Sequence, residues 1–316
     1  MKLLKLVPEN TNLDFMRWRN VALVLSLIAT AASLAFTAYR GLNLGIDFVG
    51  GQVVRVVFAQ PVHIDDLRAR VDNMGVGEAS IQSLGNQQTY QVRLPKPQGP
   101  ESASNQVVSK LRASLPKIYP GARVDAGESV SGKVSEELAQ SSAMAIAFAM
   151  LGIAVYIWFR FEWQFGVGAL LTLAHDVSMT LGFFAFFRLP VDLNVVAAFL
   201  TILGYSLNDT VVIYDRIRED LRKYRKMAIL PLINLSLNET LARTVVTSLT
   251  VLIALGVLML IGPEVIFGLA LAIFLGVLIG TYSSIYISAP VLVWLGVQPD
   301  SFLRGGEKDE AEPQTA

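Results

Sequence analysis

Residues 195–220 read VVAAFLTILGYSLNDTVVIYDRIRED, an apolar run that holds one acidic residue, Asp209, before the charged end beginning at Asp215. About 20 apolar residues at ~1.5 Å rise per residue cross the hydrocarbon of a bilayer. The run therefore predicts a membrane helix. It carries the carboxyl group of Asp209 into the bilayer, roughly 10 Å from the charged boundary at Arg216.

The whole chain has the composition of a membrane protein. Its 316 residues are 53% hydrophobic and only 16% charged, whereas soluble chains carry about a quarter charged residues. The apolar windows lack the two-residue alternation of barrel strands, so we predict an α-helical polytopic membrane protein with six transmembrane helices. The windows are residues 20–39, 140–159, 165–187, 193–214, 244–262 and 265–289.

Orientation follows from the short loops that carry Lys and Arg. The first window is too long for a signal peptide, so we read it as an uncleaved anchor. Basic residues flank its start and crowd the loop after the fourth window, which predicts that both termini, 1–19 and 291–316, are cytoplasmic. The residues that carry this prediction are Lys2, Lys5, Arg17, Arg19, Arg160, Arg216, Arg218, Arg222, Lys223, Arg225 and Lys226.

The insert 41–136 separates the first span from the five-helix membrane region 140–290 and is predicted to face outward. Its pattern reads strand, helix, strand, strand, helix, strand, which is typical of a ferredoxin-like domain. Ten basic and nine acidic residues leave no basic stripe, so we expect no nucleic-acid binding. The strands are 52–58, 79–84, 89–94 and 123–130, and the helices are 64–73 and 102–115.

Several chemistries are excluded by composition. The chain has no cysteine, which excludes thiolate catalysis and cysteine-ligated metals, and its two histidines leave little for a histidine metal site. Its 26 basic and 26 acidic residues cancel, so any electrostatic function is local. We expect no metal and no cofactor.

Ionisable residues inside the spans are the candidate functional residues, because each costs at least ~2.5–3.5 kcal/mol at the centre of a membrane helix. Asp209 has no long side chain with which to reach water. We predict that it gains and loses a proton as a cation moves near it, the alternative being a static hydrogen-bonded contact. Arg243, a turn and a half into the fifth helix after an N-cap at Asn238, can reach the same depth and pair with it, or can extend from the helix end to the lipid headgroups.

Asp176 lies near the middle of the third window, and its role is open between a proton relay and a structural contact. His175 precedes it but projects ~100° away, so the two need not act together. The sixth window carries a stripe of small residues, a packing seam within the chain or against a partner. The stripe is Gly268, Ala272, Gly276, Gly280, Ser284 and Ser288.

The sequence resembles the SecF family of bacterial protein-export membrane subunits, within the resistance–nodulation–division transporter superfamily. The motifs that carry the resemblance are GIDFVGG at 45–51, LAHDVSMTLGFF at 173–184, the run at 195–220 quoted above, TLARTVVTSLT at 240–250 and GTYSSIYISAP at 280–290. They cover all six spans in order.

The resemblance implies a subunit that uses the proton-motive force, with protons in place of a cofactor, to assist export of unfolded polypeptides across the cytoplasmic (inner) membrane. It implies SecD, the SecYEG translocon and YajC as partners. It assigns proton coupling to Asp209 and Arg243 and matches Asp176 to a His-Asp pair. Asp47, Gly50 and Gly51 match its outward-facing motif, which the residues alone indicate only as a glycine-rich turn into a strand.

Three other functions remain as alternatives. Two membrane carboxyl groups, Asp176 and Asp209, suit an intramembrane aspartyl protease, although the GxGD signature of such enzymes is missing. A non-catalytic scaffold would stabilise the translocon through the seam of the sixth span. Half of a small-molecule exporter is the third alternative, but one compact outer domain offers no obvious apolar pocket. A transport protein rather than an enzyme is the expectation.

Overall fold

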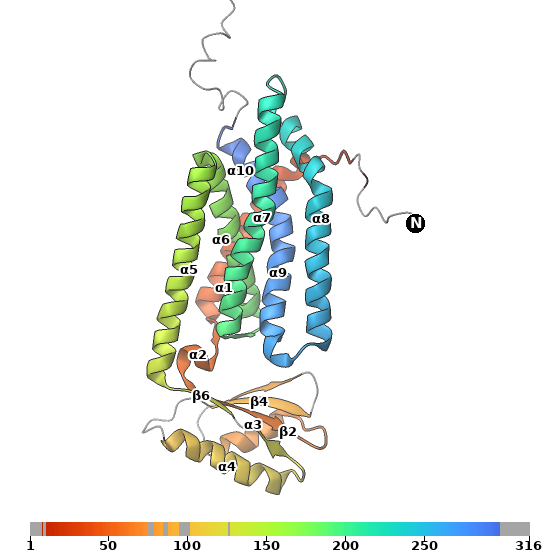
Figure 1. The fold of residues 1–316 in the computed structure, drawn as a ribbon. Helices are drawn as coiled ribbons and strands as arrows, with labels where there is room; N and C mark the ends of the chain where they lie inside the picture. Colours follow the sequence, from red (N-terminus) through yellow and green to blue (C-terminus); the bar gives the residue numbers. More distant parts are fainter. Residues whose placement is uncertain are drawn as a thin grey trace, which may run out of the picture. The chain divides into compact units, whose positions relative to one another are not determined.

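The computed structural model describes residue 8 and residues 11–74, 79–84, 88–94, 102–125 and 127–297. Among them, six helices are long and apolar enough to cross a membrane, as predicted (Figure 1). The acidic end from Gly305 lies outside the described residues. The helices are α1 (Arg19–Arg40, preceded by the 3-10 turn η1, Phe15–Trp18), α5 (Gly132–Arg160), α6 (Trp163–Phe186), α7 (Leu193–Lys223), α8 (Ile229–Ile261) and α9 (Phe267–Ser283). The last continues through η3 (Ser284–Ser288) into α10 (Ala289–Trp294).

Helix α8 begins earlier than its apolar window indicates. The predicted N-cap, Asn238, is wrong: it lies inside α8, which starts at Ile229. The Asn238 side chain instead accepts a hydrogen bond from Leu13 N (2.9 Å) and donates one to Leu13 O (2.9 Å), and Asn234 accepts one from Phe15 N (2.8 Å). The N-terminal segment thus supplies hydrogen-bond partners for the side-chain amides of Asn234 and Asn238. These polar residues therefore lie inside the helix, at the place where the sequence predicts a cap.

The compact unit that contains the bundle consists of residues 1–42, 146–189 and 197–316. The share of the apolar window that is buried is 50% in α6 and 44% in both α7 and the α9 region. The same share is only 6% in α5 and 11% in α8. Helices α6, α7 and α9 therefore form the protein core, while α5 and α8 offer most of their apolar surface to lipid or to another protein.

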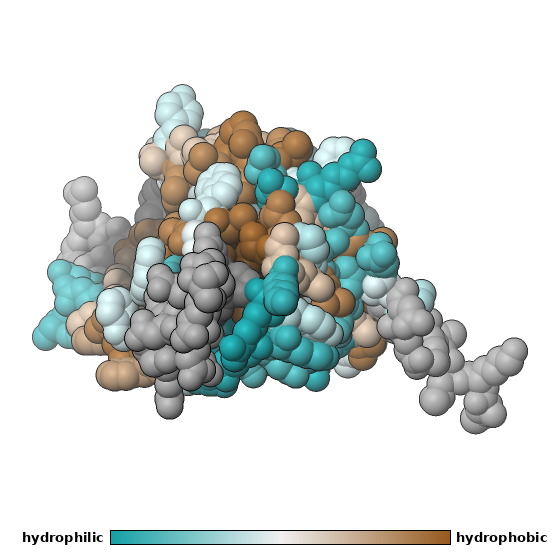
Figure 2. Space-filling model, turned by 90° about the horizontal axis from the view of Figure 1, so that it is seen from above, coloured by the Kyte–Doolittle hydropathy of each residue, from teal (hydrophilic) through white to brown (hydrophobic). Residues whose placement is uncertain are grey.

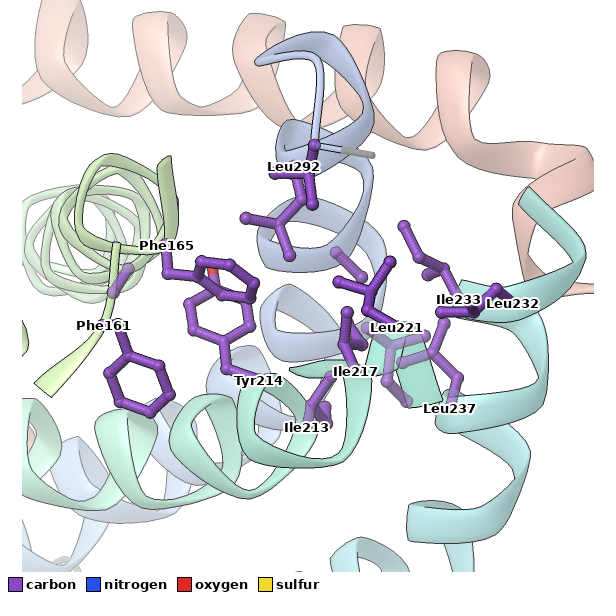
Figure 3. Packing of buried hydrophobic residues seen from close by; sticks show 14 of the residues in the cluster. Phe161, Phe165, Ile213, Tyr214, Ile217, Leu221, Leu232, Ile233, Leu237 and Leu292 are labelled. Carbon is purple, nitrogen blue, oxygen red and sulfur yellow. The ribbon is translucent and has the colours of Figure 1, made fainter. Parts of the chain in front are cut away.

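A large apolar cluster fills the core near the α7–α8 connection (Figure 3). Tyr214 of α7 packs edge-on against Phe161 and Phe165, with ring centroids 6.1 and 5.0 Å apart. Ile217 and Leu221 continue the same cluster. Figure 2, viewed from above this end, shows hydrophilic side chains gathered beside hydrophobic ones, as expected where a bundle leaves the membrane.

The second unit, residues 43–145 and 190–196, holds the sheet of the insert. Its order is β3-β4-β2-β5, with β6 also pairing with β2, and every pair is antiparallel. The element order matches the prediction, except that the predicted last strand is split into β5 and β6; the ferredoxin-like assignment stays a prediction. The bounds are β2 (Gly51–Val57), α3 (Ile64–Asp72), β3 (Ser80–Ser83), β4 (Thr89–Leu94), α4 (Ser102–Ile118), β5 (Arg123–Val124) and β6 (Glu128–Val130).

The small-residue stripe of α9 packs within the chain. A Cβ atom on Gly276 would lie 2.3 Å from Cγ1 of Ile202 on α7, and one on Gly280 would lie 3.3 Å from Cβ of Ser206. Ala272 is fully buried, and Gly268 is half-buried. Ser284 and Ser288 continue the stripe into the π-helical turn η3, where both are fully buried.

A single added methyl group tests this seam. Gly276→Ala should destabilise the protein by about 1–3 kcal/mol, because the branched side chain of Ile202 has little freedom to move away. Gly256→Ala on α8 is the matched control, since nothing lies within 4 Å of its added Cβ and alanine favours helix. Unfolding of the purified protein in detergent measures both, and equal stabilities would show that the seam is not tightly packed.

Candidate functional site

Asp209 is buried in the middle of α7, with 3% of its surface exposed. Its Oδ2 accepts one long hydrogen bond, 3.5 Å, from the hydroxyl of Ser248 on α8. That hydroxyl also shares a 2.7 Å hydrogen bond with Thr281 on α9. The carboxyl group predicted to change its protonation therefore contacts a neutral hydroxyl of α8, which is in turn hydrogen-bonded to a hydroxyl of α9.

Arg243 does not contact Asp209 in this conformation. No ion pair joins the two residues among those that the structure describes, and the Arg243 side chain is exposed. Arg243 precedes Ser248 by five residues, which places them about 140° apart around α8. Because Ser248 and Thr244 take the buried face, Arg243 lies toward the surface of the bundle.

Asp176 is held far more tightly than Asp209. It is completely buried on α6, and its Oδ2 accepts hydrogen bonds from Ser206 of α7 (2.5 Å) and Ser283 of α9 (2.9 Å). Gly280 lets α9 approach α7 closely beside this group, since a Cβ there would lie 3.3 Å from Cβ of Ser206 and at an ordinary contact distance, 3.6 Å, from the same oxygen. The carboxyl group thus ties together the three helices of the core.

His175 also contacts Asp176, contrary to the expectation from its direction on the helix. Its Nδ1 lies 2.9 Å from Asp176 Oδ1. The ring is buried, and it lines a pocket with Met179 and Tyr282. Adjacent residues with polar ends can meet in this way even though their Cα–Cβ bonds diverge.

The two membrane carboxyl groups have separate hydrogen-bond partners in the part of the chain that the structure describes. Asp176 and Asp209 share no hydrogen-bond partner among the described residues, and each is held by different hydroxyls. A proton-sharing aspartyl dyad requires the two carboxyl groups to be in contact. The arrangement gives no support to the protease alternative.

A third buried carboxyl group, Asp220, was missed in the sequence. It is completely buried and accepts a 2.6 Å hydrogen bond from Ser236, while Arg216 lies 3.5 Å from its other oxygen. Arg216 also bonds Glu239 (2.5 Å) and Glu219 (2.6 Å), which links the ends of α7 and α8. The signal was present: Asp220 follows Asp209 by eleven residues, three helical turns, and so shares its face.

The GIDFVGG motif forms a tight turn, as predicted. Gly50 and Gly51 adopt positive φ angles of 74° and 118°, and β2 begins at Gly51. Asp47 lies in the single helical turn α2 (Ile46–Val49), where its Oδ2 accepts a 2.9 Å hydrogen bond from Leu193 N. This last contact could not be predicted from the sequence, because 146 residues separate the partners.

Comparison with known proteins identifies close relatives. Residues 110–298 match the family described as "Protein export membrane protein SecD/SecF, C-terminal", and residues 40–62 match the "SecD/SecF GG Motif". The chain is 43% identical over 318 residues to the protein translocase subunit SecF of Cereibacter sphaeroides, covering 99% of this chain and 97% of that protein. It is 41% identical to the SecF of Rickettsia rickettsii, covering 92% and 94%.

A solved structure is also similar. The crystal structure of SecDF, a translocon-associated membrane protein from Thermus thermophilus, matches with a TM-score of 0.82 and 33% identity over 90% of this chain. A second SecDF structure, described as a super-membrane-facing form, matches with a TM-score of 0.67. The present chain spans 39% of the length of each of these two.

Replacement of Asp176 tests its role in holding the core. Asp176→Ala should lower stability by about 1–3 kcal/mol, because the hydroxyls of Ser206 and Ser283 lose a buried acceptor. Asp215→Ala, on an exposed carboxyl group (57%) paired with Arg160, should cost ~1 kcal/mol or less. Chemical unfolding in lipid nanodiscs distinguishes them, and equal losses would contradict a tying role for Asp176.

Proposed function

The chain belongs to the SecD/SecF family of protein export membrane proteins, and from this premise we propose that it is a translocase subunit driven by the proton-motive force. It assists export of polypeptides through the Sec translocon and is a transport component, not a chemical catalyst. The observation that carries the proposal is Asp209, a buried carboxyl group in a membrane helix that has no cation beside it among the described residues.

The contacts of Asp209 support a change of protonation. A charged carboxylate is costly inside a membrane bundle unless a cation or several donors stabilise it. In this conformation Asp209 has one distant hydroxyl donor, so the arrangement suits the neutral acid. Deprotonation would leave a buried negative charge that needs a nearby cation or further hydrogen-bond donors to stabilise it.

We propose that Arg243 is the cation that stabilises the deprotonated Asp209. In this conformation its side chain is exposed, on another face of α8 from Ser248. Rotation or repacking of α8 would bring the guanidinium toward a deprotonated Asp209, and protonation would release it. Each proton that crosses a potential of 100 mV supplies ~2.3 kcal/mol, enough to shift a conformational equilibrium about fiftyfold.

The proposed cycle needs a direction and partners. We propose that both termini are cytoplasmic, that residues 41–136 face the periplasm, and that protons enter from that side. The solved relative SecDF is a longer chain, which supports a SecD half as partner. We also propose contacts with SecYEG, YajC, membrane lipid and the exported unfolded polypeptide.

The scaffold alternative is less well supported. It requires the small-residue stripe of α9 to be available to the translocon. Gly276 and Gly280 instead pack against Ile202 and Ser206 of the same chain. The helices whose apolar windows are mostly exposed, and so available for partners, are α1, α5 and α8, with 17%, 6% and 11% of the window buried.

Neutralisation of either charged residue tests the proposal. In vesicles containing the full export complex, Asp209→Asn and Arg243→Met should each remove potential-dependent export while the complex still assembles. The amide of Asn does not titrate in this way, and Met keeps an unbranched stem at position 243 without the charge.

Asp215→Asn is the matched control, because it neutralises an exposed carboxyl group on the same helix. It should leave export and proton flux unchanged. Export by Asp209→Asn at the normal rate and with normal dependence on the potential would refute the proposal.

A further inference from the structure

The segment that follows α1 is joined to the segment that precedes α7. Strand β1 (Asn43–Leu44) pairs in parallel with β7 (Pro190–Val191), and Gly45 N donates a 2.7 Å hydrogen bond to Val191 O. Both segments belong to the same compact unit as the sheet of the insert. Residues 190–196, which include the first turn of α7, thus belong to the unit of residues 43–145 and 190–196, which we call the outer unit.

Two carboxyl groups cap the first turn of α7. Asp192 Oδ1 accepts a hydrogen bond from Val195 N (2.9 Å), the usual arrangement at a helix N-terminus. Asp47 Oδ2 accepts one from Leu193 N, also at 2.9 Å, from a segment distant in sequence. The first N–H groups of a helix lack partners within it, and negative charge there is favoured by the helix dipole. The Asp47 contact therefore holds α7 to the turn that contains the motif.

The glycine at position 45 makes this contact possible. A Cβ there would lie 3.1 Å from Val191 O and 3.3 Å from Cβ of Asp192. Any larger residue would push the turn away from the start of α7. The motif GIDFVGG thus combines a glycine for close approach, an acid for the cap, and two glycines that turn the chain into β2.

Arg93 links the two acids to the sheet. It lies on β4, and its positive charge acts on both Asp192 and Asp47. Burial raises the pKa of Asp192, the charge of Asp47 raises it further, and the Val195 N–H and Arg93 oppose the rise. Nε and Nη1 of Arg93 are buried without a hydrogen-bond partner among the described residues, so the guanidinium acts here through its charge.

We propose that Asp47 is a positioning residue that clamps the start of α7 to the outer unit, with Asp192 and Arg93 completing the clamp. This inference rests on the proposed function, since α7 is the helix that carries Asp209. The helix is continuous from Leu193 to Lys223, and Asp209 lies about 24 Å along it from the clamp at ~1.5 Å per residue. A shift of α7 driven at Asp209 is transmitted to the outer unit through this contact.

The first test separates proton flow from export. In vesicles holding the full complex, Asp47→Ala should reduce potential-dependent export about fivefold or more, while proton flux stays within about twofold. Asp47→Asn should restore most of the export, because its amide oxygen can still accept the Leu193 N–H. Asp65→Ala is the matched control: it removes an exposed carboxyl group from α3 of the same unit and should change neither readout.

The second test replaces the clamp by a covalent bond. The chain has no cysteine, so Leu44→Cys with Val191→Cys introduces one pair, at residues that face each other in the β1–β7 register. Added to Asp47→Ala in a complex otherwise free of cysteine, oxidation of this pair should restore export, and reduction should remove it again. A merely structural defect would not respond to the crosslink.

The outcomes separate the two ideas. If the unmodified complex shows no potential-dependent export, the proposed function fails. If the unmodified complex exports and Asp47→Ala does so equally well, the clamp is wrong. Loss of both flux and export in Asp47→Ala, without recovery on oxidation, also overturns the clamp.

Discussion

A carboxyl group inside a membrane bundle must be hydrogen-bonded, paired or protonated, and the core of this protein is arranged around that requirement. Three acids are buried along the bundle: Asp176, Asp209 and Asp220. Serine hydroxyls from neighbouring helices reach all three. Small residues such as Gly276 and Gly280 let α9 approach closely enough for this network to form.

The three acids differ in the hydrogen-bond and charge partners around them, and we propose that their roles differ accordingly. Asp176 has two serine donors and an adjacent imidazole, and we propose a structural role for it. Asp220 is close to Arg216. Asp209 has one distant hydroxyl, which leaves it dependent on a proton or on an approaching cation. The least satisfied group is the one best suited to drive a conformational change.

Part of this could be predicted from the sequence. The six spans were predictable because a helix needs about 20 apolar residues to cross the bilayer, and windows of that length can be found in the sequence. Asp209 was a clear candidate because it is an isolated charge within one of these windows. Contacts that depend on distant segments were not predictable. Asn238 was taken for a helix cap because its partner, Leu13, comes from the other end of the chain. The Asp47 cap was missed for the same reason, and the surface position of Arg243 depends on which face of α8 is buried.

The central claim is that Asp209 changes its protonation as the protein works, and infrared difference spectroscopy of the reconstituted complex tests it most directly. Imposing a proton gradient across the vesicles should change a band of a protonated carboxyl group, and that band should be absent in Asp209→Asn but present in Asp215→Asn. A spectrum in which the gradient produces the same carboxyl signal with and without Asp209 would contradict the account.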